Sequence, residues 1–166
     1  MVMPDNNLLH LPWNFLMSIT PEWISAIAAA VIAVGVLFAF KQLRLSKNIA
    51  QLQFEDSLAK EYRDLINGIP AMALLGEDLS EERYQKLFDQ LFRYIDLTNE
   101  EVSLRQRKRI SKEVWQYWLS GIQMNLRLPA FHRAWTEIKG KSESFQELRR
   151  LENEAFKIDP AKWEQA

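Results

Sequence analysis

The sequence predicts an all-α protein in which a single N-terminal transmembrane helix continues into a cytoplasmic bundle of four or five helices. Residues 23–40 (WISAIAAAVIAVGVLFAF) contain no charged residue, and the chain after them repeats apolar side chains at helical spacings of three and four. No segment alternates convincingly at the period of two that is typical of strands. We therefore expect an external interfacial segment at 1–19, the transmembrane helix at 20–40 and a cytoplasmic helical domain at 41–166.

The apolar run has the length of a membrane span. At about 1.5 Å per residue it forms a helix of roughly 27 Å, close to the ~30 Å hydrocarbon core of a bilayer. Thr20 suits the N-cap of this helix and Pro21 suits its first position. Pro12 interrupts the preceding apolar segment, which we expect to rest at the membrane surface. A cleaved signal peptide is the alternative, but its basic leading region is missing here.

Charge asymmetry predicts the orientation of the span. All 21 Lys and Arg residues follow the apolar run, and Lys41, Arg44 and Lys47 flank it directly. Cationic flanks stay on the cytoplasmic side of a membrane, which places the N-terminus outside and the C-terminus in the cytoplasm. Trp23 suits the opposite interface, where tryptophan is enriched. The lipid bilayer is therefore the first expected partner of the chain.

Small residues line one face of the predicted span. They recur at spacings of three and four, which permits close approach of two helices in lipid, and they are Ala26, Ala29, Ala30 and Ala33. This stripe predicts self-association into a homo-oligomer.

One helix should run from the span deep into the cytoplasmic part, because the next proline is Pro70. Beyond the membrane its apolar residues form a face, namely Leu45, Ile49, Leu52, Ala59, Tyr62 and Ile66, widened by Phe54, Leu58 and Leu65. This face either packs on its own domain or forms a coiled-coil seam between protomers.

Helix-start signals divide the rest of the chain. A helix is expected from Ser80 to about Arg107, and each later helix has its own signal. These signals are Ser111 as an N-cap, Pro129 at a first helical position, and a capping box from Ser144 to Glu147.

Five cations gather within eight residues at one predicted helix-to-helix turn: Arg105, Arg107, Lys108, Arg109 and Lys112. A solvated helix C-terminus favoured by the helix dipole accounts for them, and lipid headgroups or RNA phosphates are the alternative ligands. The cytoplasmic part is nearly electroneutral, so no global field recruits nucleic acid.

The chain offers few groups for catalysis. It has no cysteine and two histidines, His10 and His132, and it shows no recognisable phosphate-binding loop or nucleophile triad. We expect no metal and no cofactor. Asn99 is expected to bond the backbone of a neighbouring helix rather than to orient water or a metal with Glu100.

Arg127 and His132 form the one pair with a recognisable chemistry (RLPAFH). Their spacing matches the Arg and His motif of the HEPN ribonucleases, in which the imidazole moves protons at the ribose 2′-oxygen and the guanidinium stabilises the phosphorane. Leu128 and Pro129 depart from the usual pattern of that motif. The alternative is that Arg127 is a helix-terminal cation and that His132 lies on the surface.

Further runs carry a resemblance over about residues 20–140: FRYIDLTNE from Phe92, the spaced Trp115, Trp118 and Gly121, and then Leu126, Pro129 and Phe131. They resemble a family of small, functionally uncharacterised bacterial proteins with one N-terminal span, which implies the bacterial inner (plasma) membrane. In organisation the chain is also similar to the membrane-anchored accessory proteins of type VI-B CRISPR systems. That similarity implies a divergent HEPN-like helical domain and a ring-like membrane pore.

Three functions follow as hypotheses. The first is a non-enzymatic, membrane-tethered interaction module that self-associates and binds a protein partner in the cytoplasm, and we favour it because no catalytic constellation is recognisable. The second is an oligomeric membrane pore or accessory effector in phage defence. The third is a divergent HEPN-like ribonuclease.

Overall fold

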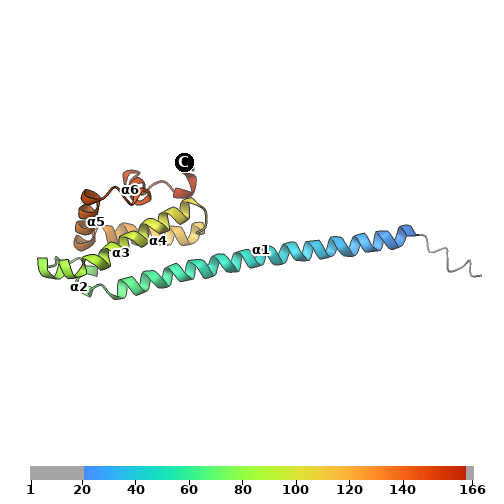
Figure 1. The fold of residues 1–166 in the computed structure, drawn as a ribbon, viewed down its shortest axis with the longest axis horizontal. Coiled ribbons are helices and arrows are strands. Elements are labelled where there is room, and N and C mark those ends of the chain that lie inside the picture. The colour runs from blue at the N-terminus through green and yellow to red at the C-terminus, as the bar shows by residue number, and fades with distance from the viewer. Residues whose placement is uncertain (1–20, 164–166) are drawn as a thin grey trace, which may run out of the picture. The chain divides into compact units, whose positions relative to one another are not determined.

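The computed structural model describes residues 21–163, and all regular elements in this range are helices (Figure 1). Six α-helices and one 3-10 turn follow one another without a strand in the described part. The predicted all-α class is therefore confirmed. The predicted external segment at 1–19 and the Thr20 cap lie outside the described residues.

Helix α1 (Pro21–Asn67) runs for 47 residues without a break. It ends directly before Gly68, Ile69 and Pro70, as the sequence predicts, because Pro70 cannot continue a helical hydrogen-bond ladder. The chain divides into two compact units between Asn48 and Ile49, so that the last turns of α1 belong to the second unit.

The first unit contributes an apolar helix with no protein cover of its own. Every described side chain from Trp23 to Phe40 is exposed. One helical stretch among the described residues, Trp23–Asn67, is long and apolar enough to cross a membrane, with a mean hydropathy of 2.5 in its most apolar window.

The second unit is built around α3 (Glu81–Gln106). This helix packs against α5, α6 and the 3-10 turn, while α4 packs against α5. Figure 1 shows α4, α5 and α6 gathered about α3. The bounds of the remaining elements are Ala71–Leu74 for α2, Lys112–Leu126 for α4, Pro129–Lys141 for α5, Gln146–Asn153 for α6 and Pro160–Lys162 for the 3-10 turn.

Aromatic side chains fill the centre of this unit. The largest fully buried ones are Trp115, Trp135, Tyr84, Tyr94 and Phe131. The rings of Tyr94 and Phe131 meet edge to face with centroids 4.9 Å apart, a favourable geometry for aromatic pairs. These rings join α3, α4 and α5 into one core.

The apolar face of α1 packs on its own domain along its last turns. Leu58 is buried, and its neighbours Phe54, Tyr62, Leu65 and Ile66 pack against the core. The Gln90 side-chain amide of α3 also donates a hydrogen bond to the Leu65 carbonyl oxygen at 2.7 Å. Leu52, two residues before this contact region begins, is exposed. The own-domain interpretation of this face is therefore confirmed from Phe54 to Ile66.

Three helix starts agree with the sequence, at Ser80, Ser111 and Pro129, and a fourth differs. The Ser111 hydroxyl accepts a hydrogen bond from the Val114 amide at 3.3 Å, and Pro129 occupies the first turn of α5. The predicted Ser144 capping box is wrong: α6 begins at Gln146, and Phe145 is the N-cap residue with a φ of 65°. The reason is packing, since the buried Phe145 ring lies edge-on against Phe92 and Trp135.

Candidate functional site

The predicted anchor residues all lie on exposed parts of α1. Lys41, Arg44 and Lys47 are exposed, and Trp23 is half exposed. The four alanines of the small-residue stripe are exposed as well, and their spacing places them on one face. The described residues thus leave this face open to a partner or to lipid.

The predicted basic cluster is split by the fold. Arg105 is buried, and its guanidinium Nε and Nη2 atoms donate to the two Asp159 carboxylate oxygens at 2.8 and 2.6 Å. Its Nη1 atom donates to the Ile110 carbonyl oxygen at 2.7 Å. These hydrogen bonds from Arg105 hold the pKa of Asp159 below its ordinary value. Arg105 therefore joins the end of α3 to the C-terminal segment.

The other four cations of the cluster, Arg107, Lys108, Arg109 and Lys112, remain exposed at the turn between α3 and α4. They stay together on the surface. The three interpretations from the sequence therefore remain open for them: a solvated helix end, binding of lipid headgroups, or binding of RNA phosphates.

Arg127 and His132 meet at one small cavity. Arg127 follows the last residue of α4 and His132 lies in the first turns of α5, and both side chains are exposed. They line a cavity of about 170 Å³ together with Trp135 and Glu152. The fold therefore brings the predicted pair to the same place on the surface of one chain.

Asn99 makes the backbone contact that the sequence predicts. Its Oδ1 atom accepts a hydrogen bond from the Leu148 amide at 3.0 Å, and its Nδ2 atom donates to a Glu147 carboxylate oxygen at 3.3 Å. Leu148 lies in the first turn of α6, so Asn99 satisfies one of the free amides at that helix start. This is a structural role.

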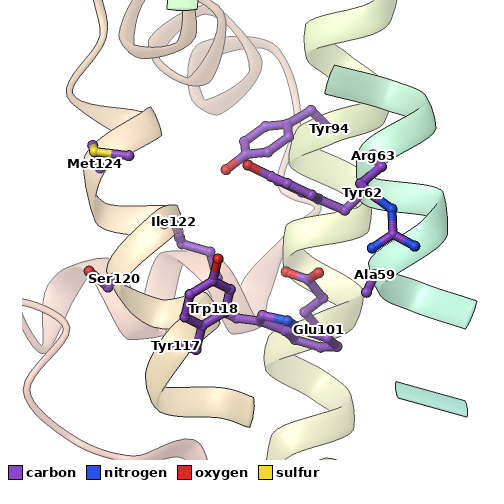
Figure 2. Close-up of a pocket in the computed structure, with 11 residues that line it drawn as sticks. Ala59, Tyr62, Arg63, Tyr94, Glu101, Tyr117, Trp118, Ser120, Ile122 and Met124 are labelled. Carbon is purple, nitrogen blue, oxygen red and sulfur yellow. The ribbon is translucent and has the colours of Figure 1, made fainter. Parts of the chain in front are cut away.

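A cavity of the second unit that contains a buried charged side chain lies between α1, α3 and α4. Its volume is about 390 Å³. Figure 2 shows Tyr62 reaching in from α1, Tyr94 and Glu101 from α3, and Trp118 from α4. The remaining lining residues are Ala59, Arg63, Tyr117, Ser120, Gly121, Ile122 and Met124. Aromatic rings from three helices therefore surround one carboxylate.

Glu101 is buried in this cavity without a polar partner. Glu101 is 5% exposed. No described residue donates a hydrogen bond to its carboxylate or forms an ion pair with it. Two other acidic or basic side chains of the described part of this unit are buried, and both have partners: Glu55 accepts from the Ser111 amide at 2.6 Å, and Arg105 binds Asp159. Burial, with the nearby Glu100 and Glu61 charges, raises the pKa of Glu101 to about 8.

A polar network joins two of the tyrosines that line the cavity. The Asn125 side-chain amide donates to the Tyr94 hydroxyl at 3.0 Å and to the Tyr62 hydroxyl at 3.4 Å. Burial raises the pKa of Tyr94 further above its already high ordinary value, so this phenol stays neutral. The network fixes the two tyrosine rings, whose centroids are 6.2 Å apart.

Sequence reasoning did not find Glu101, although the sequence holds a signal for it. Glu101 lies seven residues after Tyr94 and four before Arg105, which places it on the buried face of α3. The helical spacing places the Glu101 carboxylate on the same face as core residues, whereas its neighbour Glu100 is exposed. Trp118, predicted as a core residue, is only partly buried and lines the same cavity.

Among residues 21–163 there is no group of three or more His, Cys, Asp or Glu side chains placed to hold a metal ion. No protein-family model, curated protein or solved structure matches this chain.

Proposed function

We propose that this chain is a membrane-tethered interaction module of the bacterial inner (plasma) membrane. Residues 20–40 cross the bilayer once, residues 1–19 lie outside, and residues 41–166 form a helical domain on the cytoplasmic side. The module acts by self-association and by binding a protein partner in the cytoplasm, without catalysing a reaction.

The observation that supports the anchor is the exposure of the apolar stretch. From Trp23 to Phe40 no described side chain is covered by the rest of the chain. An uncharged exposed stretch of this length is costly in water, whereas a bilayer of about 30 Å accommodates it. Lys41, Arg44 and Lys47 support the orientation, because cationic flanks favour the cytoplasmic side.

Membrane fractionation of cells that express the full chain tests the anchor. We expect the chain to stay in the pellet after an alkaline carbonate wash. A variant with Val31→Arg and Leu37→Arg should appear in the soluble fraction, because each arginine at the centre of a span costs about 2.5–3.5 kcal/mol of insertion free energy.

The matched control changes two exposed leucines of the second unit, Leu52→Arg and Leu75→Arg. This variant gains the same charge and should remain in the pellet. Release of the unmodified chain by the carbonate wash would refute the anchor.

A divergent HEPN-like ribonuclease is the second candidate, and it is favoured by one observation: Arg127 and His132 line the same cavity. The interaction-module proposal predicts that the purified full chain cleaves no RNA above background. It also predicts that His132→Ala changes the free energy of unfolding by no more than about 1 kcal/mol, since His132 is exposed. Metal-independent cleavage that is lost in both Arg127→Ala and His132→Ala would favour the ribonuclease instead.

A further inference from the structure

The cavity around Glu101 has the size and lining of a small-molecule site. Its volume of about 390 Å³ falls within the range of about 300–1,000 Å³ that is common for ligand pockets. Tyr62, Tyr94 and Trp118 present aromatic rings to it, and one buried carboxylate is the single acidic group among its lining residues. Such pockets bind the body of a ligand by apolar contact and orient it through a few polar groups.

The charges around the cavity favour a cation. Glu61 of α1 and Glu100 of α3 add negative charge near Glu101. Arg63 lies at the exposed rim, and α4 contributes uncharged lining residues, including Tyr117 and Trp118. Faces of tyrosine and tryptophan rings also attract cations through their quadrupoles. A cationic group in the cavity would therefore be attracted both by the carboxylate and by the rings.

We propose that this cavity binds a protonated amine with an aromatic body, with the ammonium group donating hydrogen bonds to the Glu101 carboxylate and the body lying among Tyr62, Tyr94 and Trp118. N–H donors suit this site because the ionised Glu101 carboxylate has no hydrogen-bond donor among the described residues. A quaternary ammonium offers charge but no donor, so it would leave these oxygens unsatisfied.

Calorimetric titration of the full chain in detergent micelles with 2-phenylethylamine tests the proposal. We expect saturable binding with a Kd of about 1 mM or below, as is reasonable for a ligand with few non-hydrogen atoms. The uncharged 2-phenylethanol and trimethyl(2-phenylethyl)ammonium should each bind at least about tenfold more weakly, because each lacks part of the charge-assisted hydrogen bond.

Glu101→Gln keeps the shape of the side chain and removes its charge. It should weaken amine binding by at least about tenfold. The matched control is Asp96→Asn, which removes the same charge from an exposed position of α3 that does not line the cavity, and which should change the affinity by less than about threefold. Circular dichroism shows whether each variant keeps its helices. Ala59→Trp, which fills the cavity from α1, provides a second variant that should abolish binding if Glu101→Gln does not fold.

The proposal also predicts release of a proton on binding. Since the pKa of Glu101 is about 8 in the free protein, its carboxyl is mostly protonated at pH 7, and it must ionise to pair with the ammonium. Titrations at pH 7 in buffers of different ionisation enthalpy should show close to one proton released, with little release at pH 9. No saturable binding of the amine, or equal affinity in Glu101→Gln and the unmodified chain, would overturn the proposal.

Discussion

Glu101 shows how a single residue can couple this fold to pH. In water the carboxyl of a glutamate is ionised at neutral pH, whereas in the cavity between α1, α3 and α4 burial favours its neutral form. The pKa is about 8 in the folded chain against 4.5 for an exposed glutamate. Between these two pH values the folded state holds a proton that the unfolded state has lost. Stability must therefore fall as the pH rises through this window.

We predict that the free energy of unfolding of the full chain falls by up to about 4 kcal/mol between pH 5 and pH 8, because one proton held only by the folded state changes this free energy by about 1.4 kcal/mol per pH unit. Glu101→Gln should remove most of this dependence and should be more stable than the unmodified chain at pH 8. Denaturant titrations in detergent at several pH values measure the effect.

Asp96→Asn is the control for this measurement, because Asp96 is exposed on the same helix, carries the same charge and is not among the groups that raise the pKa of Glu101. It should retain most of the fall in stability. If the unmodified chain and Glu101→Gln show the same pH dependence, the account of Glu101 as a buried, unpartnered acid is incorrect.

At the scale of the helices, local signals predicted element types well and exact starts less well. The Ser111 cap and the Pro129 start follow from local chemistry and agree with the structure. The Ser144 capping box failed because the start of α6 is set by contacts from distant parts of the chain: the Phe145 ring packs on Phe92 and Trp135, and Asn99 of α3 accepts from a first-turn amide of α6.

The same limit applies to the charged residues of the helices. Arg105 looks like one of five clustered cations in the sequence, yet it is buried against Asp159, which lies 54 residues later. Spacing along α3 places Arg105 and Glu101 on the core face, but only the tertiary structure shows that the first has a partner and the second has none. The sequence can therefore indicate that both charged side chains lie on a buried face, but not which of them has a partner.

The small-residue face of α1 predicts self-association of the chain. Replacing Ala29 and Ala33 by leucine should lower the oligomer fraction in mild detergent several-fold, because bulk on this face keeps two helices from approaching closely. Ala28→Leu with Ala39→Leu is the matched control, since it adds the same volume on the opposite face. Size-exclusion chromatography with light scattering measures both.

An unchanged monomer in the unmodified chain and in both variants would remove self-association from the proposed function. Equal losses in the two variants would show instead that added bulk disturbs the helix regardless of its face.

At the scale of the whole chain, two parts differ in how they bury apolar side chains. The unit from residue 49 onward has a closed core of aromatic and aliphatic residues, including Trp115, Trp135 and Phe131. The stretch from Trp23 to Phe40 has none of its side chains covered. This difference is the one expected for a protein with a domain that folds in water and a helix that lies in lipid, as proposed above.

Topology mapping tests the central proposal most directly. In bacteria, a fluorescent reporter that folds only in the cytoplasm is fused after Ala166, and a reporter that is active only outside the inner membrane is fused before Met1. The account predicts that both fusions are active in the membrane fraction, because Lys41, Arg44 and Lys47 hold the C-terminal side in the cytoplasm. An external C-terminus, or a cytoplasmic reporter that fractionates with soluble proteins, would contradict it.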